Sequence, residues 1–252
     1  MADSKITALT AVTTLANDDV FAVVDDPSGT PVTKKITTND LFKLPAGTTA
    51  LAPIRFTSGT NLTTAEAGAM EYDGKVHYSS HAASSRGVNL SEQFITLQAA
   101  NTLATAGPGV RAIFNSPTNG TVTLPGNTTY FFTCYGSITS LSATSGSMSL
   151  AFGGTASTTV LRYCGTASKA AATAATTQFA NVGTSASTII TAANTTTTAQ
   201  FFVEGMVVVD TGGTLIPQIA HSVEARPIIA AGSSFRIWPV GNSTVASVGN
   251  WS

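Results

Sequence analysis

The chain has 252 residues, a formal net charge of −1 and a sequence pI of about 6.3. This charge balance argues against a nucleic-acid-binding protein, which needs a basic face to neutralise phosphates. Charged residues make up 10% of the chain, and residues 93–252 contain only eight of the 25. So sparse a charge is unusual for the surface of a free enzyme and favours β-structure buried in an assembly.

Composition also predicts a mainly β protein. The hydrophobic fraction of 43% is sufficient for a core, and about one residue in six is Thr, which favours strands. No apolar leader follows Met1 and the apolar runs are strand-length, so we expect no secretory signal, no membrane span and synthesis in a cytoplasm. For Cys134 and Cys164 we expect two buried free thiols, with a disulfide as the alternative.

Residues 1–45 predict a small module. A strand over 20–25, a turn containing Pro27 and Gly29, and a return strand over 32–37 form a hairpin. A short helix follows, with Thr38 or Asn39 as its N-cap. Because an isolated hairpin is marginally stable, we expect this module to pack on a partner or on copies of itself.

Residues 46–92 predict a linker region that contains a second hairpin. Asp73-Gly74 is a strong signal for a two-residue turn between alternating strands. With that turn, the side chains of Met70, Tyr72, Val76 and Tyr78 could share one face.

Residues 93–252 predict a β-sandwich, because short strands recur about every ten residues between Gly-rich connectors. Ser168–Ala180 is Ala-rich and predicts a helical turn or a loop, and Thr191–Thr198 predicts a loop tip. We interpret Phe131-Phe132 and Phe201-Phe202 as core strands, which leaves no obvious aromatic binding patch. The expected strands are Phe94–Leu97, Val110–Phe114, Thr121–Leu124, Thr129–Ser137, Ser147–Phe152, Thr158–Cys164, Gln200–Val209, Thr214–Ala220 and Ser234–Pro239.

The sequence shows no catalytic constellation. His77, His81 and His221 lack metal-ligand spacing, and there is no nucleophile elbow, phosphate loop or dinucleotide fingerprint. The paired acids Asp18-Asp19 and Asp25-Asp26 are interpreted as solvated turn residues rather than a calcium site or glycosidase carboxylates. We therefore expect no enzyme activity, no cofactor and no metal.

Three stretches resemble proteins of tailed bacteriophage virions. The first, made of Lys5–Thr10, Asp18–Asp25 and Thr33–Leu41, looks like an N-terminal attachment module. The second, Pro53–Thr60 with Ala67–Gly74 and Tyr78, resembles a linker motif of the same proteins. The third is similar to phage head domains of the jelly-roll type, akin to the tumour-necrosis-factor and complement-globular fold, and is carried by Leu124–Tyr130, Phe152–Thr155, Ala231–Ile237 and Gly249–Ser252.

The resemblance implies a homotrimer located on the virion. A small module that cannot bury its own apolar face and a low-charge sandwich would both gain from threefold association. The alternative for the apolar residues of the module is an ordinary intrachain core. The candidate attachment and trimer contacts are Phe21, Val23, Ile36, Leu41 and Phe42.

Two structural functions and one enzymatic function follow as hypotheses. A capsid decoration or cement protein would bridge neighbouring subunits of the major capsid protein, as the short length and missing shaft repeats favour. A tail-fibre or receptor-binding protein would attach to a tail component and contact a host surface glycan or protein. A virion enzyme would have to use Glu204, Asp210 or Glu224, the only acids in residues 93–252, and is the least favoured.

Overall fold

The computed structural model describes two compact units, Met1–Phe56 and Thr57–Ser252. The description covers residues 16–244 except 17, 26–27, 42, 45, 104–108, 115–119, 141–147, 170–176, 182–186, 191–197 and 222–226. Residues 1–15, Thr191–Thr197 and the closing Gly249–Ser252 lie outside the described residues.

The first unit contains the expected hairpin. Strands β1 (Val20–Asp25) and β2 (Val32–Thr37) pair antiparallel, and the short helix α1 (Thr38–Leu41) follows directly. The predicted helix cap is wrong by one residue, because the cap is Thr37. Its Oγ1 accepts a hydrogen bond from the Asp40 backbone N at 3.2 Å and donates to Asp40 Oδ2 at 2.7 Å.

The second unit begins with a three-stranded sheet of β3 (Met70–Tyr72), β4 (His77–Ala82) and β5 (Ser85–Asn89). The hairpin at Asp73-Gly74 exists, but its loop has four residues, since Tyr72 pairs with His77. Asp73 Oδ1 accepts hydrogen bonds from the backbone N of Lys75 and of Val76, both at 2.8 Å. This longer loop changes the register, so Tyr78 lies opposite Glu71 and not on the face of Met70 and Tyr72.

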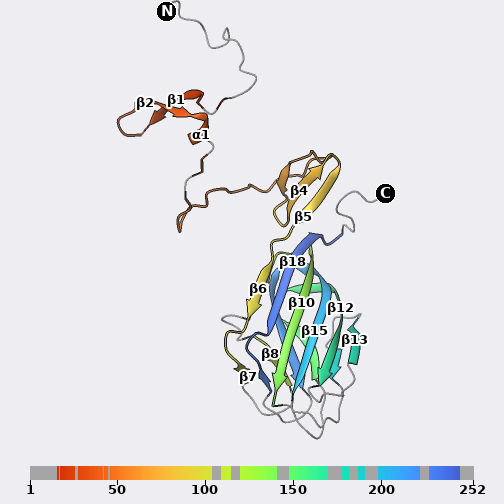
Figure 1. The fold of residues 1–252 in the computed structure, drawn as a ribbon. Coiled ribbons are helices and arrows are strands. Elements are labelled where there is room, and N and C mark those ends of the chain that lie inside the picture. The colour runs from red at the N-terminus through yellow and green to blue at the C-terminus, as the bar shows by residue number, and fades with distance from the viewer. Residues whose placement is uncertain are drawn as a thin grey trace, which may run out of the picture. The chain divides into compact units, whose positions relative to one another are not determined.

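Residues from Gln93 onward form the expected β-sandwich (Figure 1). All nine expected strands are present. Eight described strands form one antiparallel sheet, called the large sheet below: β6 (Gln93–Thr96), β7 (Asn101–Thr102), β10 (Thr128–Thr139), β12 (Ser157–Lys169), β13 (Thr177–Asn181), β15 (Ala199–Thr211), β17 (Ile228–Ile229) and β18 (Ser234–Asn242). The second sheet contains β8 (Gly109–Ala112), β9 (Val122–Leu124), β11 (Met148–Gly153), β14 (Ser187–Ile190) and β16 (Gly213–His221).

The strand order is that of a jelly roll. The large sheet runs β6-β18-β10-β15, and the second sheet runs β9-β16-β11-β14. The hairpin of β12 and β13 is added beyond β15 at the edge of the large sheet. Strand β13 corrects the expectation of a helical turn or loop over Ser168–Ala180, because the last residues of that segment, from Thr177 onward, form a strand that pairs with β12.

The core lies between the two sheets. Phe132 of β10 contacts Phe152 of β11 edge-on, with ring centroids 5.1 Å apart, and Phe235 of β18 lies 5.8 Å from Phe132. The hydroxyl of Tyr163 on β12 donates to the Leu150 carbonyl on β11 at 3.1 Å, which satisfies a buried polar group across the sandwich.

Two glycines make room for core aromatics. Phe132 pairs with Gly205 across β10 and β15, and Gly136 pairs with Phe201 in the same ladder. In each pair the ring lies where a side chain on the glycine would stand, because an added Cβ would come within 2.7 Å of Phe132 or 2.3 Å of Phe201. The two pairs thus fill the core by reciprocal large-to-small matching across one strand pair.

Candidate assembly face of the large sheet

The outer face of the large sheet, the side away from the core, carries large apolar side chains. Alternation along β10 buries Phe132 and Cys134 and turns Phe131 and Tyr135 outward. On β15 the same alternation buries Phe201 and turns Phe202 outward. Phe131, Tyr135 and Phe202 are 44%, 39% and 45% exposed. We call this surface the assembly face, defined by its outward residues Phe94, Phe131, Thr133, Tyr135, Arg162, Cys164, Phe202, Glu204, Met206, Arg236 and Trp238.

Strand register arranges these side chains in rows across the sheet. Phe131 pairs with Trp238 on one side and with Met206 on the other, which gives a first apolar row. Tyr135 pairs with Phe202, which gives a second apolar row four residue pairs further along. Because aligned positions of antiparallel strands share a face, the rows are fixed by the hydrogen-bond ladder.

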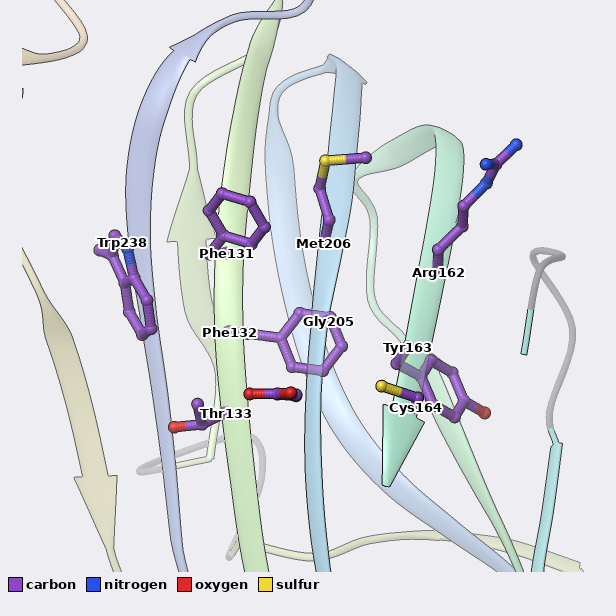
Figure 2. Close-up of a pocket in the computed structure, with 10 residues that line it drawn as sticks. Phe131, Phe132, Thr133, Arg162, Tyr163, Cys164, Gly205, Met206 and Trp238 are labelled. Atoms are coloured by element: carbon purple, nitrogen blue, oxygen red, sulfur yellow. The ribbon is translucent and has the colours of Figure 1, made fainter. Parts of the chain in front are cut away.

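The row between the two apolar rows is polar, and a hollow lies on this part of the sheet. Thr133 pairs with Glu204, which in turn pairs with Cys164. The hollow has a volume of about 610 Å³, and its floor is the backbone around Gly205. Figure 2 shows Trp238 and Phe131 on one side of it and Arg162 and Cys164 on the other. Its lining is therefore mixed, because Thr133, Arg162 and Glu204 line it together with the aromatic and apolar side chains.

The charged residues of this face include Arg236 and Glu204, which pair with Thr133 on either side, and Arg162, which pairs with Met206. Arg236 of β18 binds Glu92 through two hydrogen bonds, Nε to Oε1 at 2.8 Å and Nη2 to Oε2 at 2.6 Å. These bonds hold the pKa of Glu92 below its usual value and raise that of Arg236. Phe94 of β6 pairs with Arg236 and is 56% exposed, so the apolar surface continues beyond the ion pair.

The assembly face corrects the interpretation of the two Phe-Phe pairs made from the sequence. Phe131-Phe132 and Phe201-Phe202 were expected to be core strands, but one member of each pair is buried and the other exposed. Period-two alternation was the available signal, because two adjacent residues of a strand cannot point into the same core. The expectation for Cys164 is also wrong: the thiol is free, as expected, but exposed, whereas Cys134 is free and buried.

No protein-family model matches this chain, and no curated protein is significantly similar to it. The functional argument therefore depends on the geometry of the chain itself. Within the described residues, no three His, Cys, Asp or Glu side chains cluster closely enough to hold a metal ion. No described helix has the length and hydropathy needed to cross a membrane.

The sequence-predicted contacts of the first unit lie on or next to the hairpin. Phe21 and Ile36 are directly paired, and Val23 stands on the same face two residues along β1. Phe21 and Val23 are exposed and Ile36 is half-buried; Leu41, on α1, is exposed. Phe42 lies outside the described residues. The sequence analysis missed Val32, which is exposed and shares the face of Phe21 and Val23.

Proposed function

We propose that the protein is a non-enzymatic homotrimeric structural protein on the surface of a tailed phage virion, where it serves as a capsid decoration or cement protein. The assembly face is the observation that carries the structural role. Monomeric proteins rarely expose contiguous apolar patches of more than a few hundred Å². Exposed aromatic side chains that include Phe131, Tyr135 and Phe202, next to the half-buried Trp238, therefore favour burial against another protein surface.

A second copy of the chain is the occupant that this proposal assigns to the assembly face. The face combines aromatic and apolar side chains with three charged residues, Arg162, Glu204 and Arg236. Arg236 is already paired with Glu92 within the chain, whereas a second copy would have to supply partners for the Arg162 and Glu204 side chains that it covers. Threefold closure and location on the virion rest on the resemblance of the attachment module, the linker and the jelly roll to phage virion proteins.

Bridging of coat subunits would need no chemistry from this chain. In this role the trimer stabilises the shell by burying surface across joints between subunits of the major capsid protein. Among the described residues, no group of three His, Cys, Asp or Glu side chains could hold a metal ion, and both cysteines are free thiols.

The aromatic hollow favours a second candidate, a tail-fibre or receptor-binding protein. Aromatic side chains can stack on a host glycan, and the short supply of such side chains was an argument against this function. The hollow lined by Phe131, Trp238 and Met206 removes that argument. In this candidate the assembly face stays open and contacts the host.

Sedimentation of the full-length protein and antibody labelling of virions separate the candidates. The decoration proposal expects a trimer in solution. It also expects an antibody raised against residues 93–252 to label the whole icosahedral head. Label confined to the tail would instead establish the fibre candidate. A monomer at micromolar concentration would contradict the assignment of the assembly face to a second copy.

A further inference from the structure

Two charged side chains of the assembly face have no partner within the described part of the chain. Arg162 stands at the end of the first apolar row, next to Met206, and Glu204 stands in the polar row, between Thr133 and Cys164. Both are exposed in the single chain. Among the described residues, neither forms an ion pair or a side-chain hydrogen bond.

Arg162 and Glu204 are diagonal neighbours across β12 and β15, yet they do not meet. Such diagonal positions lie about 7–8 Å apart, within reach of long side chains. Figure 2 shows Arg162 extending away from Cys164, which is the direct strand partner of Glu204. The base and the acid therefore both stay available to groups outside the chain.

Covering the assembly face makes these two charges costly unless they acquire partners. An ionised side chain that is buried without a partner strongly destabilises the structure that buries it. Arg236, the third charged residue of the face, already binds Glu92 within the chain. One base and one acid therefore remain, and a second copy that meets them with its own assembly face brings the matching acid and base.

We infer that Arg162 of one copy forms an ion pair with Glu204 of the next copy across the assembly face. This inference rests on the proposed homotrimer. In a closed ring of three copies every contact is head-to-tail, so the same ion pair forms at each joint. The pair also fixes the register in which the copies meet, because other alignments of the two faces leave these charges unpaired or oppose like charges.

Charge exchange in the full-length protein tests the inference. Arg162→Glu and Glu204→Arg each place like charges at the proposed contact, so each should raise the protein concentration needed for trimer formation by at least about tenfold. The two changes combined in one chain restore opposite charges and the wild-type net charge. This double variant should assemble at nearly the wild-type concentration, as measured by sedimentation velocity over a dilution series.

Thermal melting of the same variants controls for folding. Because Arg162 and Glu204 are exposed in the single chain, the dissociated single variants should melt as cooperatively as the wild type.

A mixture of the two single variants distinguishes a contact between copies from one within a chain. In a mixed trimer, two of the three joints bring opposite charges together, so mixing should recover assembly that neither variant shows alone. Recovery in the double variant but not in the mixture would place the ion pair within one chain and overturn the inference.

The remaining outcomes separate failure of the ion pair from failure of the proposed homotrimer. A wild-type trimer whose assembly is unchanged by both single variants would show that the two charges lie outside the contact, and the homotrimer would stand without the ion pair. Dissociation of the single variants with no recovery in the double variant or the mixture would show that the charges bind other groups. A wild-type monomer would overturn both the ion pair and the homotrimer.

Discussion

Cys134 and Cys164 lie on opposite faces of the large sheet. Cys134 pairs with Val203 and is fully buried in the core, whereas Cys164 pairs with the adjacent Glu204 and lines the outer hollow. Side chains that point away from each other across a sheet cannot form a disulfide without backbone movement. Burial raises the pKa of Cys134 to about 12, so this thiol stays protonated and unreactive near neutral pH.

The two thiols give a direct test of the assembly face. If a second copy covers the hollow, neither thiol of the native protein should react rapidly with a thiol reagent such as Ellman's reagent. Dissociation should expose Cys164 alone, and unfolding should expose both thiols. The number of rapidly reacting thiols per chain should therefore rise from zero to one to two. One rapidly reacting thiol in the native wild type would mean that the hollow is open.

Phe202→Asp should dissociate the oligomer. A central aromatic side chain at an interface commonly contributes about 2 kcal/mol or more, and a buried unpaired carboxylate adds a further penalty. Because Phe202 is 45% exposed in the single chain, its replacement should leave the melting of the sandwich itself nearly unchanged. Sedimentation velocity over a dilution series is the measurement.

Val110→Asp is the matched control for this substitution. Val110 is 47% exposed on β8 of the second sheet, so the change introduces the same charge at an exposed apolar position away from the assembly face. This variant should sediment like the wild type. Equal dissociation of both variants would show that added charge alone, and not loss of the assembly face, separates the copies.

The positions of the strands followed from the sequence, but their edges and orientation did not. Runs such as Thr129–Ser137 have the β-branched and aromatic residues that strands favour, and β10 is found there. Strands β13 and β14 were missed because they are short and lie in Ala- and Thr-rich segments where no hydrophobic alternation distinguishes strand from loop.

The candidate site depended on register, which the sequence leaves open. Which member of Phe131-Phe132 enters the core is set by the pairing of Phe132 with Gly205, a contact between residues more than 70 positions apart. The row of Trp238, Phe131 and Met206 likewise exists only after three strands align. By contrast, the hairpin of β1 and β2 could be predicted, because its two strands are local in sequence.

Arg86→Met should raise the pKa of Glu71. The Arg86 guanidinium donates to both Glu71 oxygens, Nε to Oε2 at 2.8 Å and Nη2 to Oε1 at 3.1 Å, and this hydrogen bonding holds the pKa of Glu71 below its usual value. Leu62 N donates to the same carboxylate and Leu62 O accepts from Arg86, so the pair fastens the segment before β3. A carboxyl-detected NMR titration measures the shift.

The sign of the pH effect follows from the lowered pKa of Glu71. A carboxyl whose pKa is lower in the folded than in the unfolded chain stabilises the fold above its unfolded pKa, about 4.3, and this contribution is lost as pH falls through the folded pKa. The protection factor of the Leu62 amide against hydrogen exchange should therefore fall in acid in the wild type and depend less on pH in Arg86→Met. Glu92, paired with Arg236, is the internal control and should titrate identically in the wild type and in Arg86→Met. An unchanged pKa of Glu71 in Arg86→Met would contradict the assigned cause of its shift.

Gly205→Ala should destabilise the sandwich by about 1–3 kcal/mol, the usual cost of overpacking a core. An added Cβ would come within 2.5 Å of the Arg162 carbonyl oxygen and 2.7 Å of the Phe132 ring, so the strand or the ring must shift. Gly59→Ala is the control, because a Cβ there meets no atom within 4 Å. In chemical denaturation, the midpoint should be lower for Gly205→Ala and unchanged for Gly59→Ala. The reason is that the absence of a side chain at Gly205 lets Phe132 reach the aromatic cluster between the sheets. Equal midpoints for the two variants would mean that Phe132 can move aside, and that its pairing with Gly205 does not hold the aromatic core in place.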